Sequence, residues 1–161
     1  MSKTVVVGGN EISFPTSGEQ ENWAQPVSDF AEATAEVLSQ FANAYDVPPN
    51  DLIIDAYNPG VDIELPGLNF PPSAVRSAFI RYAVFRQTNT TTVYETGNIT
   101  IVYNPNGPVN NKWEYSRDFI GDGQIDFTID DSGQITFTTT AIGGISHSGK
   151  VSYLAQAVIQ T

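Results

Sequence analysis

Cysteine is absent from this chain of 161 residues, and basic residues are scarce. Without cysteine there are no disulfide bonds, thiolate metal sites or cysteine nucleophiles, so packing alone must hold the fold together. Only seven lysines and arginines accompany eighteen acidic residues, and the net charge is −11. This charge repels phosphate backbones and anionic lipid headgroups, so we expect neither nucleic acid nor a membrane as a partner.

Long apolar segments are missing as well. No uninterrupted apolar run approaches the roughly 20 residues that span a bilayer. Residues 1–9 lack the apolar core and the cleavage site of a secretory signal. We therefore expect a soluble protein that is made in the cytoplasm.

The chain divides into two parts that differ in charge and in periodicity. Residues 1–64 contain eleven acidic residues and one basic residue, whereas residues 65–161 contain seven acidic and six basic residues. The first part holds the long helical pattern, and the second part alternates apolar and polar residues as β-strands do. This division predicts a mainly β protein, in which an antiparallel β-sandwich or jelly-roll-like module is preceded by an N-terminal arm and one amphipathic α-helix.

Three segments follow from this division. Residues 1–49 are predicted to form the arm and an assembly helix, residues 50–74 a linker or edge segment with Pro-Gly turns, and residues 75–161 the β-sandwich module. Within the arm, Gly8-Gly9-Asn10 separates two short β-prone pieces. This pattern is typical of a small hairpin or of an extended arm, and the sequence leaves both forms open.

A heptad pattern marks the helix. From Trp23 to Ala44, apolar or permissive positions recur at alternating spacings of four and three residues. Asn22 is a candidate N-cap, and Pro48-Pro49 is expected to end the helix. These positions form an apolar stripe along the helix, which we call the heptad seam. Either the chain's own sheet or other copies of the chain must cover this seam, and the sequence leaves both possibilities open. If copies cover it, the assembly interface consists of Trp23, Val27, Phe30, Val37 and Phe41.

Several strands are predicted in the β module. Residues 77–86 are apolar on both faces, as a central strand would be, and residues 91–95 and 97–103 form a second pairing candidate. Residues 125–129 and 134–138 alternate strongly on either side of a turn that contains glycine. They predict a β-hairpin.

No catalytic constellation accompanies these elements. His147, the single histidine, lies in a turn rich in serine and glycine. A solvated turn histidine is favoured over a Ser-His-Asp arrangement, because no nucleophile-elbow sequence is present. The aspartates of residues 122–131 lack EF-hand spacing, so turn chemistry explains them more simply than calcium binding. We therefore predict a protein that is not an enzyme, with no catalytic residue, metal site or cofactor.

Aromatic side chains offer a different kind of site. Tyr94, Tyr103, Trp113 and Tyr115 could stack on sugar rings if their strands are neighbours on the solvent side. Core packing is the favoured interpretation for Trp113. The sequence leaves the role of the three tyrosines undecided, so a glycan-binding surface stays open as an alternative.

Three arginines fall in one strand region. Arg76, Arg81 and Arg86 are spaced by five residues, so Arg81 faces the opposite way from the other two on a regular strand. They form no single basic stripe. Pairing with the acidic helix, of the same subunit or of a neighbouring one, is the expected role for them.

Two stretches resemble segments of bacteriophage virion proteins. Residues 13–33, in which an Asn-Trp pair leads into the acidic helix, resemble the attachment or trimerisation segment of phage tail-fibre, head-fibre and capsid-decoration proteins. Residues 125–140, Gly143-Gly144 and residues 149–157 are similar to the closing β-hairpin and last strand of phage virion structural modules.

The resemblance implies a trimeric virion component without enzymatic activity. Family members with a receptor-binding tip have a longer shaft or tip domain after the helix, so the short β module favours a capsid decoration, cement or short tail-appendage role. The implied partners are copies of the chain in a homotrimer and other virion proteins, such as the major capsid or tail proteins. The alternative is a carbohydrate-binding module or the receptor-binding tip of an appendage.

Overall fold

The computed structural model describes residues 3–7, 10–14, 24–41, 44–109 and 111–159. The chain forms two compact units, Met1–Ala44 and Tyr45–Thr161. Residues 50–74, for which a linker or edge segment is expected, thus belong to the second unit. They include most of one strand and all of another, and both strands lie at sheet edges.

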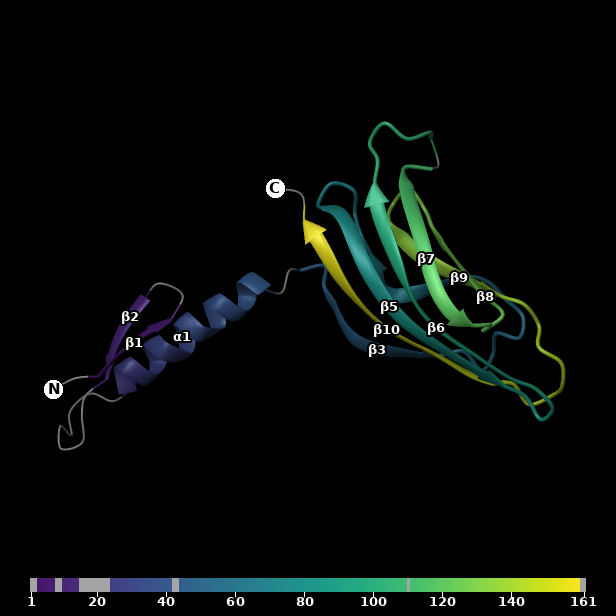
Figure 1. Ribbon diagram of the computed structural model, residues 1–161, viewed down its shortest axis with the longest axis horizontal. Coiled ribbons are helices and arrows are strands. Elements are labelled where there is room, and N and C mark those ends of the chain that lie inside the picture. Colours follow the sequence, from purple (N-terminus) through teal and green to yellow (C-terminus); the bar gives the residue numbers. More distant parts are fainter. Residues whose placement is uncertain (1–2, 8–9, 15–23, 42–43, 110, 160–161) are drawn as a thin grey trace. The chain divides into compact units, whose positions relative to one another are not determined.

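A hairpin and a helix make up the first unit (Figure 1). Strands β1 (Lys3–Val7) and β2 (Asn10–Phe14) pair antiparallel, so the arm adopts the hairpin form. Helix α1 (Ala24–Phe41) packs against this hairpin, and Ile12 and Ala33 are buried, each only 6% exposed. No helix in the described part of the chain is long and apolar enough to cross a membrane.

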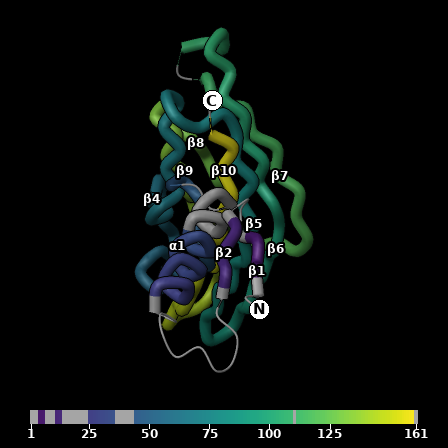
Figure 2. Tube along the Cα trace, turned by 90° about the vertical axis from the view of Figure 1, so that its left-hand side faces the viewer, coloured from purple at the N-terminus to yellow at the C-terminus, as the bar shows by residue number. Residues whose placement is uncertain are grey.

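Two antiparallel sheets make up the second unit. The larger sheet has five strands in the order β3-β10-β5-β6-β7, and the smaller has three in the order β4-β9-β8. Figure 2 shows β4, β9 and β8 to one side of β10, β5, β6 and β7, as two layers. The prediction of a mainly β fold with antiparallel sheets and one helix is confirmed. The strands are β3 (Val47–Ile53), β4 (Gly60–Asn69), β5 (Val75–Gln87), β6 (Thr92–Tyr103), β7 (Trp113–Gly121), β8 (Ile125–Ile129), β9 (Gln134–Thr139) and β10 (Ser148–Ile159).

The inward faces of the two sheets form one apolar core. Along β5, buried and exposed side chains alternate from Ala78 to Gln87, as they do in a strand with one face on a core. Ile80 and Val84 of this strand share the core with Phe127 and Phe137 of the smaller sheet. Full burial of one such side chain stabilises the fold by roughly 1.5–3 kcal/mol before the cost in conformational entropy.

The hairpin predicted at residues 125–138 is confirmed as β8 and β9, with Phe127 opposite Phe137. Residues 77–86 are confirmed as part of the central strand β5, which pairs with β10 and β6. Residues 91–95 and 97–103, by contrast, form the single strand β6 and not two pieces. Gly97, the first residue of the second piece, continues the strand and leaves space for Tyr82, because a Cβ at Gly97 would lie 2.8 Å from the Tyr82 hydroxyl.

Pro48-Pro49 lies inside β3, although it was expected only to end the helix, which already stops at Phe41. β3 is the edge strand of its sheet and pairs only with β10. Its outer edge requires no hydrogen-bond donor, so it tolerates proline.

Candidate functional site

A hollow crosses the outward face of the five-stranded sheet. It has a volume of about 540 Å³ and adjoins a second hollow of about 260 Å³, and Arg81 and Thr96 line both. We call the two together the outer-face hollow. Ligand sites of roughly 300–1,000 Å³ are typical of proteins, so this hollow is large enough for a ligand.

Small side chains form the floor of the hollow. Strand register places Ala83 of β5 between Ser152 of β10 and Thr96 of β6. The next outward positions along these strands carry larger residues, with Leu154 beside Arg81. A row of small residues beside a row of larger ones leaves a depression that runs across the strands.

A polar row borders this floor. Arg81 lies opposite Asn98, and Asn98 lies opposite Asp118, so the three residues occupy one row across β5, β6 and β7. All three line the hollow. Within the described part of the chain, none of the three side chains forms a hydrogen bond or an ion pair. Their hydrogen-bonding capacity is therefore not used by the fold.

Two exposed rings flank the other side of the floor. Phe85 and Tyr94 lie opposite each other on β5 and β6, two residues along each strand from Ala83 and Thr96. Phe85 is 44% exposed and Tyr94 is 70% exposed. Two residues of a strand span about 6.7 Å, so the rings form the next outward row after the floor, outside the residues that line the hollow.

An ion pair fixes the charge at the β3 end of the hollow. Lys150 Nζ lies 3.1 Å from Asp51 Oδ2. A hydrogen bond from the Ser152 side chain, with that of Lys150, lowers the pKa of Asp51. Together with Arg81 and Asp118, these groups give the hollow and its border two positive and two negative charges.

The four aromatic candidates do not gather into one platform. Tyr94 lies on the outward face of its sheet, whereas Tyr115 lies opposite the inward Ile101. Trp113 is only 3% exposed and belongs to the core, as favoured from the sequence, and its ring centroid lies 5.2 Å from that of Tyr103. Of the four, only Tyr94 stands beside the outer-face hollow.

The candidate assembly residues are described in part. Val27 is 53% exposed and Phe30 is 39% exposed on α1. Trp23 lies outside the described residues, and so do the side chains of Val37 and Phe41. The covering of the heptad seam therefore stays a prediction for those three positions.

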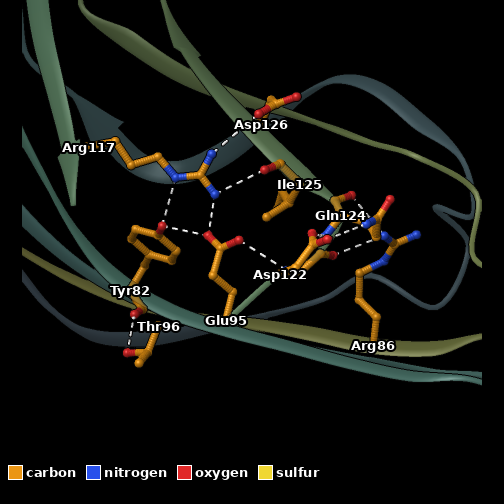
Figure 3. Close-up of polar contacts among 10 residues, drawn as sticks. Tyr82, Arg86, Glu95, Thr96, Arg117, Asp122, Gln124, Ile125 and Asp126 are labelled. Atoms are coloured by element: carbon orange, nitrogen blue, oxygen red, sulfur yellow. Dashed lines mark hydrogen bonds and ion pairs between the residues drawn. The ribbon is translucent and has the colours of Figure 1, made fainter. Parts of the chain in front are cut away.

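A polar network lies on the inward side of the same sheet (Figure 3). Glu95 is 3% exposed and forms an ion pair with Arg117. The Tyr82 hydroxyl donates to Glu95 Oε1 at 2.6 Å, and Arg117 Nε donates to the Tyr82 oxygen at 2.8 Å. The Gly123 N–H donates to the other Glu95 oxygen at 3.0 Å.

Burial and these partners set the acid–base behaviour of the network. Burial, with the hydrogen bond to Glu95, raises the pKa of Tyr82 to about 12. Burial alone would lower the pKa of Arg117, but its hydrogen bonds to Tyr82 and Glu95 reverse this, and the pKa is raised. The Glu95–Arg117 pair is already neutralised and fully engaged, so we assign it to the fold and not to catalysis.

Arg86 is buried in a socket of oxygen and nitrogen acceptors and is 0% exposed. Burial lowers the pKa of its guanidinium. It makes five hydrogen bonds, to Gly123 O, Gln124 O, Thr140 O, Asn58 Oδ1 and His147 Nε2. These bonds use all five N–H donors of the side chain. The expected pairing with the acidic helix is therefore wrong for Arg86.

His147 is half-buried, and the fold uses both of its ring nitrogens. Nε2 accepts from Arg86 at 3.3 Å, and Nδ1 lies 2.9 Å from the Asp55 carbonyl oxygen. The sequence favoured a solvated histidine in a turn, but the ring is half-buried and both of its nitrogens bond to the protein. Both nitrogens are occupied by groups other than serine, so the ring has no Ser-His-Asp geometry.

The aspartates near residue 130 serve turns. Asp130 Oδ1 accepts from the Ser132 N–H at 2.9 Å and from the Gln134 N–H at 3.0 Å. Asp122 Oδ1 accepts from the Gln124 N–H at 3.0 Å. Among the described residues, no group of three or more His, Asp or Glu side chains is arranged to hold a metal ion.

Comparison with known proteins adds little to this description. No family model and no curated protein matches the sequence. The fold is similar to the crystal structure of the Acinetobacter phage vB_ApiP_P1 tailspike protein, with 11% identity and a TM-score of 0.44. The likeness covers 70% of this chain and 22% of that protein. A likeness of this size says nothing about function, so the hollow must be interpreted from its own residues.

Sequence reasoning did not single out Asn98, Asp118, Ser152 or Asp51 as site residues. These side chains become neighbours only through the register of β3, β10, β5, β6 and β7. The outward facing of Arg81, opposite to Arg86, was the one available signal, and the structure confirms it.

Proposed function

We propose that this chain is an accessory structural protein of a bacteriophage virion, without enzymatic activity, that assembles as a homotrimer through its N-terminal unit. One observation supports the assembly. The hairpin covers α1 near Ala33, whereas Val27 of the predicted heptad seam remains 53% exposed. The two residues lie about 120° apart around the helix, so the edge of the seam at Val27 is left open to a neighbouring copy.

The virion location rests on the resemblance of residues 13–33 and of the closing hairpin to phage virion segments. In this proposal the protein is made in the host cytoplasm. It then joins the particle beside major capsid or tail proteins, as a capsid decoration or cement protein or as a short tail appendage. The protein would stabilise the particle by burying surface between subunits. At such interfaces, a few buried apolar side chains contribute most of the binding energy.

Light scattering coupled to size-exclusion chromatography tests the assembly. The full chain is expected to elute with the mass of a trimer, and Val27→Glu is expected to shift it to a monomer, because a carboxylate would then enter an apolar seam. Ala35→Glu is the matched control. It adds the same charge at an exposed position outside the heptad seam and is expected to leave the mass unchanged.

A wild-type chain that is monomeric at all accessible concentrations would contradict the proposal. So would a trimer whose mass is insensitive to Val27→Glu. Circular dichroism of both variants shows whether the helix is retained, so a change in mass can be separated from a loss of structure.

A further inference from the structure

We propose that the outer-face hollow binds a neutral oligosaccharide. The hollow crosses five strands, from Asp51 on β3 to Ile120 on β7. Four strand spacings amount to about 19 Å, which is long enough for several sugar rings in a row. This inference goes beyond the proposed virion role, and it uses only residues of the second unit.

The polar row supplies the hydrogen bonds that sugar hydroxyls require. Arg81 only donates, Asp118 only accepts, and Asn98 does both. A sugar hydroxyl is both donor and acceptor, so a row with this mixture can satisfy it at neighbouring positions. Because the fold uses none of these three side chains in the described part of the chain, they are available to a ligand.

The exposed rings supply the apolar half of the site. Phe85 and Tyr94 stand side by side on the outward face, one row beyond the small floor residues. The C–H face of a pyranose packs on an aromatic ring, while its hydroxyls point sideways to polar groups. A polar row on one side of a narrow floor and two rings on the other match these two requirements.

The charges select against an anionic ligand. Arg81 and Lys150 are balanced by Asp118 and Asp51, and Asp51 is already paired with Lys150 at 3.1 Å. The whole chain carries a net charge of −11, which disfavours the approach of phosphates and acidic polysaccharides. Among glycans, these charges therefore favour a neutral one over an acidic one.

An array of neutral bacterial oligosaccharides, together with titrations of chitohexaose, maltohexaose and cellohexaose, tests the inference on the full chain. The wild-type protein is expected to bind at least one of these probes. Arg81→Ala and Tyr94→Ala are each expected to weaken that binding by about tenfold or more, since each removes a direct contact. Tyr115→Ala is the control, because this tyrosine is exposed but lies on the inward side of the sheet.

Absence of binding to every probe would overturn the inference, and so would an equal loss of binding in the Tyr115→Ala variant. A second copy covering this face is the competing occupant. In that case Arg81→Glu would lower the mass measured by light scattering, and no glycan would bind. The assembly proposal can fail separately, because a monomeric Val27→Glu variant is expected to retain glycan binding per chain.

Discussion

The two faces of β5 use arginine in opposite ways. Arg86 points inward, is 0% exposed, and has all five N–H donors bonded to the protein. Arg81 points outward and makes no hydrogen bond in the described part of the chain. The fold therefore accounts completely for one arginine and leaves the other for solvent or a ligand. Polar groups that the fold does not use are the best guide to function in this molecule.

The largest effect on stability is expected from the inward network. Glu95→Gln removes the partner charge of Arg117 at a buried position, and breaking such a pair costs about 3–5 kcal/mol of the free energy of unfolding. Urea unfolding measures the change. Glu64→Gln, an exposed change on β4, is the control and is expected to stay within about 0.5 kcal/mol of the wild type. A small change for Glu95→Gln would show that the pair contributes little.

The next effect concerns the two arginines directly. Arg86→Lys keeps the charge but offers three donors to five acceptors, so at least two of the five hydrogen bonds are lost. The expected loss is about 2–3 kcal/mol of unfolding free energy. Arg81→Lys, the same change on the outward face, is expected to have almost no effect on stability. Equal losses for the two variants would abolish the distinction between the faces.

A smaller effect compares two aspartates. The carboxylate of Asp130 accepts hydrogen bonds within its turn. Burial alone would raise the pKa of Asp130, but the hydrogen bonds from Ser132 and Gln134 outweigh this effect and lower the pKa. Its contribution is therefore full above the ordinary pKa of aspartate, about 3.9, and is lost as the pH falls through the lower folded value. Asp130→Asn is expected to cost about 1 kcal/mol at neutral pH, and less in acid.

Asp118→Asn is the control for that prediction, because Asp118 forms no bond with the described residues. In denaturant titrations at neutral pH, this variant is expected to stay within about 0.5 kcal/mol of the wild type. If Asp130→Asn costs the same at every pH, its carboxylate charge does not stabilise the turn.

Patterns close together in the sequence predicted most of the fold. The heptad spacing gave the helix, and the alternation around Gly133 gave the β8–β9 hairpin. Residues 91–95 and 97–103 were predicted as two pieces, but Gly97 lies within the single strand β6, packed against Tyr82.

The site depended on information that is not local. Arg81, Asn98 and Asp118 come from three different strands. The strand register brings them into one row, and short-range sequence patterns do not specify that register. The small floor residues Ala83 and Ser152 give no sign of a binding site when the sequence is read alone. They form a hollow only because β5 and β10 are neighbours despite their separation in the chain.

Alanine-methyl NMR during titration with the glycan that binds tightest tests the central claim most directly. Ala83 lines the outer-face hollow, whereas Ala78 and Ala155 lie on the inward faces of β5 and β10, at 3% and 2% exposure. The account predicts a saturable shift of the Ala83 methyl signal, with the Ala78 and Ala155 signals unchanged. An unchanged Ala83 signal would contradict it, since the outward face would then not contact the ligand.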